Sequence, residues 1–299
     1  MVRPIRRVVE SLQRASPTRL QFPEHILQQV DLGDPAAENE IAGLKKYFVP
    51  TSQFYEAKRG HARLVVGRKG TGETALFYEL QKALASGRST FILDLKPEGH
   101  QFIKLREVIL DLTPGLQEHT MIALWTYLLL GEFANRILND EGPYSRTDSR
   151  RSELYGRLRE IYQAHELMDQ DDLSERIVIE IARLEARYKN FVGIKTAAKL
   201  TELIFRGDIR ILEDAVTNYL RDKRFVWLLI DNLDKGWPTR GTSAADILII
   251  RSLLDASRSY RPNSPKRASS FVVLYSYELT FMITSFLRPP TKPRTRLSA

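Results

Sequence analysis

The stretch LVVGRKGTGETALFYEL, residues 64–80, constrains the fold more than any other part of this 299-residue chain. A short apolar run leads into a turn that contains Gly67, Gly70 and Gly72, and the residues after the turn have the spacing of a helix. Glycines let the backbone fold so tightly that successive amide groups point into one small space, and a following helix adds the positive end of its dipole. The order strand, glycine-rich turn, helix therefore predicts an anion site of the kind that cradles phosphate groups.

One position departs from the pattern of such loops. The pattern G-x-x-x-x-G-K-[ST] uses its lysine to neutralise the β- and γ-phosphates and its hydroxyl to hold Mg²⁺. Residues 67–74 match it except at the lysine position, where this chain has Glu73. We expect Thr74 to contribute to the Mg²⁺ site. The predicted phosphate-contacting set is Gly67, Arg68, Lys69, Gly70, Thr71, Gly72, Glu73, Thr74 and Ala75.

The charge at Glu73 bears on both nucleotide affinity and hydrolysis. A pair of unit charges ~4 Å apart interacts by about 4 kcal/mol at an effective dielectric near 20, so reversing one charge changes the free energy of binding by roughly twice that amount. A ligand of millimolar to micromolar affinity has only about 4 to 8 kcal/mol of binding free energy. The sequence therefore predicts strongly impaired hydrolysis, and it leaves two alternatives for nucleotide binding: none, or weak binding if Glu73 turns outward or becomes protonated.

A second motif, FVWLLIDNLDKGW at residues 225–237, complements the loop. An apolar strand that ends in aspartate places a carboxylate at the carboxyl edge of a sheet, where α/β proteins bind ligands. Asp231 is expected to hold Mg²⁺ through water, and Asp234 to orient or activate the attacking water, which makes these two the predicted catalytic residues. The alternative is a strand-end aspartate that only caps a turn.

Together, GRKGTGET and LLIDNLDKGW resemble a group of bacterial P-loop ATPases related to the KAP and STAND branches of the AAA-like superfamily, several of which occur in phage defence. Their loop typically reads G-R-K-G-[ST]-G-K-[ST], and their second motif D-[DN]-L-D-K-x-W, which Asp231, Asp234, Lys235 and Trp237 match. The resemblance covers residues 30–280. It implies binding of ATP and Mg²⁺, ATP hydrolysis coupled to conformational change, and oligomerisation. Because Glu73 departs from the family, a catalytically dead scaffold or regulatory protein remains the alternative.

The remaining segments complete the predicted architecture. Apolar runs at STFILDL and SSFVVLYSYE predict further strands, and amphipathic spacing fills most of residues 113–222 with helices. We expect an α/β fold, a three-layer P-loop NTPase core with a mostly parallel sheet and a helical insertion. The predicted domains are a basic lead-in (1–30), the first part of the core (31–112), the helical insertion (113–222), the second part of the core with the Asp231 strand (223–287), and a disordered basic tail (288–299).

Composition narrows the setting and the partners. The chain has no cysteine, which excludes disulfides and thiolate metal sites, and it has no apolar stretch that would serve as a signal peptide or span a bilayer. A cytoplasmic protein without membrane contact is expected. Five arginines and one glutamate among residues 1–19, and four basic residues among 288–299, account for the whole net charge of +8. Solvated tails are favoured over weak nucleic-acid contact by these ends.

Two further surfaces are candidates for protein partners. The helical block at 113–222 is a candidate surface for a homo-oligomer or a partner protein. Arg251, Arg258 and Arg261 follow the second motif, and each is a candidate for a transition-state arginine offered to a neighbouring subunit. An exposed helix face is the favoured interpretation of these arginines.

Overall fold

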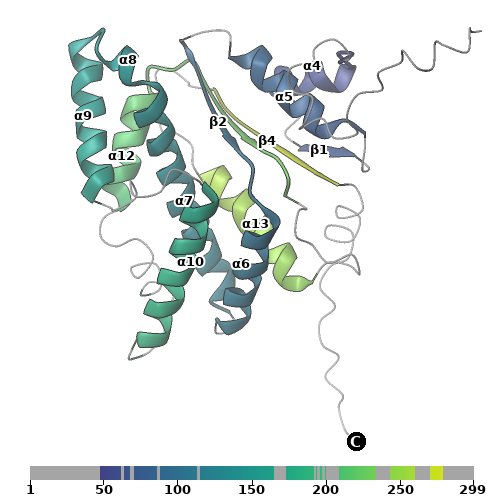
Figure 1. Cartoon of the computed structure of the whole chain (residues 1–299), viewed down its shortest axis with the longest axis vertical. Coiled ribbons are helices and arrows are strands. Elements are labelled where there is room, and N and C mark those ends of the chain that lie inside the picture. The colour runs from purple at the N-terminus through teal and green to yellow at the C-terminus, as the bar shows by residue number, and fades with distance from the viewer. Residues whose placement is uncertain are drawn as a thin grey trace, which may run out of the picture. The chain divides into compact units, whose positions relative to one another are not determined.

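Four parallel strands form one sheet in the order β1-β4-β3-β2 (Figure 1). The computed structural model describes residues 48–61, 64–67, 71–85, 88–112, 115–164, 173–191, 193, 196, 199, 209–233, 243–259 and 270–278. The strands are β1 (Leu64–Gly67), β2 (Thr90–Leu95), β3 (Phe225–Ile230) and β4 (Ser270–Glu278). β3 lies between β2 and β4, and its uninterrupted apolar sequence FVWLLI is buried at all but the first residue, as expected of a parallel strand covered on both faces.

Helices connect the strands and fill most of the described chain. Those before the third strand are α4 (Ser52–Lys58), α5 (Glu73–Leu84), α6 (Gly99–Asp111), α7 (Gln117–Asp140), α8 (Gly142–Ser145), α9 (Ser149–Ala164), α10 (Leu173–Asn190) and α12 (Ile209–Leu220). α13 (Ala244–Ser259) follows β3. It begins with a reciprocal cap, in which the Asp246 amide donates to Ser243 Oγ at 3.2 Å and the Ser243 amide donates to Asp246 Oδ2 at 2.7 Å.

The alternating side chains of β3 divide the core between the two faces of the sheet. Val226, Leu228 and Ile230 belong to the larger core cluster, which includes residues of α6, α7, α9, α10, α12 and α13. Trp227 and Leu229 belong to a smaller cluster with residues of α4 and α5. Figure 1 accordingly shows α4 and α5 on one side of the strands and α7 and α13 on the other. The helix that follows the glycine-rich loop, α5, therefore covers one face of the sheet together with α4, opposite the larger cluster.

The predicted three-layer P-loop NTPase core with a helical insertion is wrong for this chain. Most described residues are helical, and the strands have only four, six, six and nine residues. α7, which the prediction assigns to an insertion, packs against β2 and α13 within the larger cluster. Its 24 residues span roughly 36 Å, which is longer than the short strands can cover. Much of the apolar surface of the helices is therefore buried against other helices, with α7 packed on α13 and α9 on α12. The domain boundaries themselves stay a prediction, and residues 1–30 and 288–299 lie outside the described residues.

Trp125 shows how closely α7 joins the rest of the core. Its side chain is buried, and its indole Nε1–H donates to the backbone oxygen of Ile249 in α13 at 3.1 Å. Trp125 also packs beside Phe102 of α6, with ring centroids 6.5 Å apart. The helical spacing predicted within residues 113–222 is thus confirmed at α7, and this helix is part of the main core.

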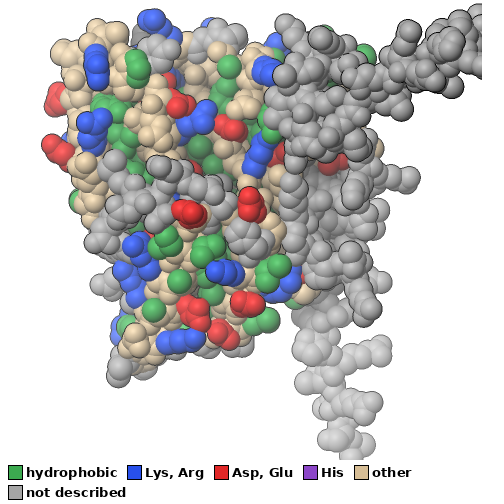
Figure 2. All heavy atoms as spheres, in the orientation of Figure 1, with side chains coloured by type: hydrophobic (Ala, Val, Ile, Leu, Met, Phe, Trp, Pro, Cys, Tyr) green, Lys and Arg blue, Asp and Glu red, His purple; other side chains and the backbone are tan. Residues whose placement is uncertain are grey.

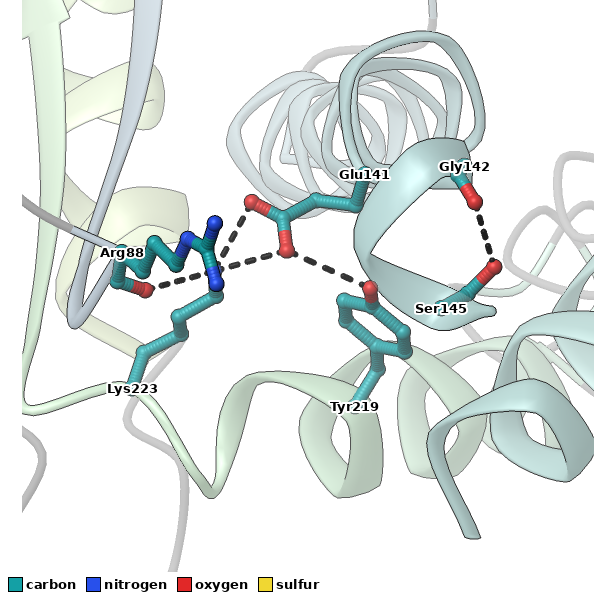
Figure 3. Close-up of polar contacts among 6 residues, drawn as sticks. All are labelled: Arg88, Glu141, Gly142, Ser145, Tyr219 and Lys223. Carbon is teal, nitrogen blue, oxygen red and sulfur yellow. Dashed lines mark hydrogen bonds and ion pairs between the residues drawn. The ribbon is translucent and has the colours of Figure 1, made fainter. Parts of the chain in front are cut away.

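A buried polar cluster ties the end of α7 to the amino edge of the sheet (Figure 3). The Lys223 ammonium donates to both carboxylate oxygens of Glu141, at 2.8 and 2.7 Å, and to the backbone oxygen of Arg88 at 3.0 Å. Tyr219 also donates its hydroxyl to Glu141, at 3.3 Å. Lys223 and Arg88 come just before β3 and β2, at the end of the sheet opposite Asp231, so we interpret this cluster as structural.

Two buried tyrosines predict loss of stability at alkaline pH. Burial raises the pKa of Tyr162, and burial together with the Glu141 carboxylate raises the pKa of Tyr219. The folded protein therefore keeps protons that the unfolded chain releases near pH 10, so the contribution of these two groups to the free energy of unfolding is constant below about pH 9 and falls as pH rises through 10. Urea unfolding at pH 8 to 11 measures this, and Tyr162→Phe should fall less steeply than wild type. Equal slopes for the two proteins would contradict the assignment.

Two observations on the described residues bear on membrane and nucleic-acid partners. Among the residues that the structure describes, no helix is both long enough and apolar enough to cross a bilayer. On the face drawn in Figure 2, the Lys and Arg side chains are interspersed with Asp and Glu side chains instead of gathering into one patch.

Candidate functional site

The glycine-rich stretch forms a strand and a helix as its sequence predicts. β1 ends at Gly67, residues 68–70 lie outside the described part, and α5 begins at Glu73. Gly72 caps this helix with φ of +89°, a left-handed conformation that side chains disfavour. Apart from its chain neighbours, no atom of the described residues lies within 4 Å of the place where a Cβ on Gly72 would be. The first amides of an α-helix have no acceptor within the helix, so the start of α5 is a suitable place for an anion.

Glu73 occupies the position where the loop pattern requires lysine. Its side chain is half-buried, and Thr71 Oγ1 donates to Glu73 Oε1 at 2.8 Å. A carboxylate in the first turn of a helix is stabilised by the helix dipole, by about 0.3 to 1 kcal/mol. Glu73 thus supplies at the start of α5 the negative charge that a phosphate group would otherwise bring.

The direction of Glu73 follows from the stripe it begins. It lies one turn before Phe77, which is fully buried, and Leu80 and Leu84 continue the same stripe. Because residues at i, i+4, i+7 and i+11 share one face of a helix, Glu73 lies on the face of α5 that packs on the sheet. Thr74 and Ala75 follow it in the first turn and are half-buried.

Asp231 lies directly after β3 and is 3% exposed. Its amide donates to the backbone oxygen of Leu95 at 3.0 Å, which extends the ladder between β3 and β2 by one residue. The alternation of β3 continued to this residue places its carboxylate on the face of Trp227 and Leu229, which is the α5 face. The next residue, Asn232, has φ of +62°, and such left-handed residues other than glycine are uncommon and often lie at functional sites.

The sheet brings the two motifs to one edge. Register pairs Gly67 with Glu278 and Ile230 with Tyr275, so β1 and β3 flank β4 and all three end on the same side. Strands two apart in a sheet lie about 10 Å from each other, a separation comparable to the length of a triphosphate with its metal ion. The predicted residues Arg68, Lys69, Gly70 and Asp234 lie outside the described residues.

Sequence reasoning missed Lys96, which follows β2 at the same edge. Its ammonium lies 3.5 Å from the centroid of the Tyr78 ring and 4.9 Å from that of Phe77, both on α5. A single lysine after an apolar strand is too common to be noticed in a sequence. Its significance depends on the pairing of β2 with β3 and on the packing of α5, which only the structure gives.

The described arginines after the second motif, Arg251 and Arg258, lie on an exposed face of α13. Arg251 is 65% exposed and pairs with Glu118 at 3.3 Å, and Arg258 is 69% exposed and pairs with Asp255 at 3.6 Å. Arg261 lies outside the described residues. Exposed pairs of this kind contribute little to stability and do not hold a side chain in one place.

A cavity of about 340 Å³ lies elsewhere, between α6 and α10. It is lined by Val108, Asp111, Leu112, Leu184, Glu185, Tyr188 and Lys189. None of these residues belongs to the loop or to the strand ends at the carboxyl edge. We therefore place the candidate site on the chemistry of that edge and not on the size of this cavity.

Comparison with known proteins gives one partial similarity. No family model matches the chain, and no solved structure matches it significantly. A protein of Escherichia coli described as "Putative transposon gamma-delta 80.3 kDa protein" is 33% identical over 108 residues, which are 35% of this chain and 16% of that protein. The aligned part thus spans about a sixth of the length of that protein.

Proposed function

We propose that this chain binds Mg²⁺ and a nucleoside triphosphate, ATP by its family resemblance, at the carboxyl edge of the sheet. The observation that carries the proposal is the joint placement of the left-handed Gly72 at the start of α5 and the buried Asp231 carboxylate on the α5 face of the same sheet edge. A partial similarity that covers 35% of the chain adds no constraint on the ligand, so the proposal rests on this geometry.

The residues present fit such a ligand in all but one respect. The amides at the start of α5 would contact phosphate oxygens, while the Thr74 hydroxyl and the Asp231 carboxylate would hold Mg²⁺. Mg²⁺ prefers oxygen ligands and keeps several waters, which suits one hydroxyl and one carboxylate. Bound Mg²⁺ would offset phosphate charge during hydrolysis. Glu73 opposes the phosphate charge, so we propose weak binding and impaired hydrolysis in this chain.

The wider setting is proposed on the family resemblance and on composition. It comprises a cytoplasmic location, a role in antiviral defence, conformational change coupled to hydrolysis, and assembly through the helices of residues 113–222. Weak nucleic-acid contact by the basic ends, residues 1–19 and 288–299, is the less favoured alternative to solvated tails. The alternative function is a catalytically dead scaffold that no longer responds to nucleotide.

Thermal unfolding with and without Mg²⁺-ATP tests the proposal. A ligand at a hundred times its Kd stabilises the folded state by about 2.7 kcal/mol, which raises Tm by about 5 °C or more in a chain of this size. We expect Mg²⁺-ATP to raise the Tm slightly for the wild-type chain and by about 5 °C for Glu73→Lys, and chelating Mg²⁺ should abolish each rise. A rise for Glu73→Lys alone would favour the scaffold alternative. If neither protein responds, the proposed site is wrong.

A further inference from the structure

The carboxyl edge of the sheet holds a cation that the loop pattern does not include. Lys96 follows β2, and the amide of Asp231 bonds to the oxygen of Leu95, so Lys96 and Asp231 are neighbours on adjacent strands. Adjacent strands are about 4.8 Å apart. Ile92 packs with the α5 cluster whereas Leu93 and Leu95 belong to the opposite cluster, and this alternation puts Lys96 on the α5 face, with Asp231.

The environment of Lys96 fixes where its charge lies. Its side chain is half-buried, with the ammonium 3.5 Å from the centroid of the Tyr78 ring and 4.9 Å from that of Phe77. The negative faces of aromatic rings attract cations, so these contacts hold the ammonium against α5. Among the described residues, Lys96 forms no ion pair with a carboxylate. The charge is therefore positioned without being neutralised by a salt bridge.

The backbone on both sides of Lys96 is also held. β2 pairs with β3 as far as Leu95, and Pro97 is buried. Glu98 then caps α6 in a reciprocal box, in which the Glu98 amide donates to Gln101 Oε1 at 3.1 Å. Lys96 thus lies between two fixed elements, and its ammonium lies against the rings of Tyr78 and Phe77, the second of which is one turn along α5 from Glu73.

We propose that Lys96 is a phosphate-binding residue of this chain and takes the place of the lysine that Glu73 replaces. The inference rests on the proposed function, because it needs a triphosphate at the sheet edge. A lysine side chain is a flexible point charge with three donors, so it can approach phosphate from the neighbouring strand end as well as from the loop. Ligand binding draws the ammonium from the Tyr78 ring toward the phosphate oxygens.

Equilibrium dialysis of full-length variants against Mg²⁺-ATP tests the proposal. We expect Lys96→Met to raise the Kd at least about tenfold, since a charge-assisted hydrogen bond is lost. Lys96→Arg keeps the charge and should stay within about threefold of wild type. Lys82→Met is the matched control: it removes an exposed lysine of α5, where Lys82 pairs with Glu79, and should leave the Kd unchanged. Melting temperatures without ligand show that each variant is folded.

The outcomes separate this inference from the proposed function. If wild type binds and Lys96→Met binds equally well, the Lys96 inference is wrong and the nucleotide site stands. If wild type fails to bind while Glu73→Lys binds, Lys96 does not replace the missing lysine, and the inference is again overturned. If neither wild type nor Glu73→Lys binds, the proposed function itself is overturned and the inference with it.

Discussion

Replacing Glu73 by lysine is expected to turn this chain into a measurable ATPase. The substitution reverses a charge at the proposed phosphate site, worth up to about 8 kcal/mol at an effective dielectric near 20, and solvent screening reduces this at a half-buried position to a few kcal/mol. Each 1.4 kcal/mol is a factor of ten, so the affinity for Mg²⁺-ATP should rise at least about a hundredfold. Steady-state phosphate release should rise from background to roughly 10⁻² s⁻¹, a rate typical of slow nucleotide hydrolases.

The same substitution should make the ligand-free protein slightly less stable. Glu73 lies at the positive end of the α5 dipole and accepts a hydrogen bond from Thr71, and both interactions are lost with lysine. We expect a loss of about 1 kcal/mol in the absence of ligand. A lysine at this position would attract phosphate but is unfavourable at the positive end of the α5 dipole when no ligand is bound. We therefore expect activity to rise and ligand-free stability to fall in the same variant.

A charge reversal elsewhere controls for the overall change in charge. Glu56 on α4 has a side chain 48% exposed, with exposed partners Arg59 and His61. Glu56→Lys changes the net charge by the same amount as Glu73→Lys and should leave phosphate release at background. Phosphate release from Glu73→Lys that is no faster than from Glu56→Lys would contradict the assignment of this loop.

Breaking the buried ion pair between α7 and α10 is expected to have the largest effect on stability. Arg176 donates to Glu132 through Nε at 2.6 Å and Nη2 at 2.8 Å, with both side chains less than a tenth exposed. Arg176→Met leaves the Glu132 carboxylate buried without its main partner, and such a change costs about 3 to 5 kcal/mol. Urea unfolding measures the loss of free energy.

A double variant distinguishes the pair from the packing around it. Arg176→Met combined with Glu132→Leu removes both charges, and replacing a buried pair by apolar side chains is often neutral. We expect the double variant to recover most of the loss. The exposed pair Arg59–Glu56 supplies the contrast, because Arg59→Met should change stability by less than about 0.5 kcal/mol. A double variant as unstable as Arg176→Met would show that the packing of Arg176, and not the pairing of charges, stabilises α10.

Local features of this chain can be predicted from sequence because neighbouring residues determine them. The apolar runs at residues 64–67, 90–95, 225–230 and 270–278 form strands, and Ser243 caps the helix that follows the second motif. The start of α5 directly after the glycine-rich turn also follows from local spacing. These elements depend on side chains a few positions apart, which periodicity and capping rules describe.

The prediction of the overall fold is wrong because the fold depends on which helices pack against one another. Periodicity predicts a helix at α7 but gives no reason to pack it on β2 and α13 instead of leaving it in an insertion. The link from Lys223 to Glu141 spans 82 residues of sequence, and Trp125 reaches its acceptor in Ile249 across 124. Contacts at such separations have no local signal in a single sequence.

The residues of the candidate site also differ in whether a local motif identifies them. Glu73, Thr74 and Asp231 can be found from their motifs, and the structure places Glu73 at the start of α5 and Asp231 directly after β3. Lys96 cannot be found in that way, because it becomes part of the edge only through the register of β2 with β3 and the rings of α5.

Calorimetric titration of Glu73→Lys with Mg²⁺-ATP tests the central claim most directly, because it restores the one element that the loop lacks. A nucleotide site at the carboxyl edge predicts saturable binding of one nucleotide per chain at micromolar concentration, abolished by chelating Mg²⁺ and weakened at least about tenfold by adding Asp231→Asn. The absence of saturable heat from folded Glu73→Lys would contradict it, and so would binding that neither the chelator nor Asp231→Asn affects.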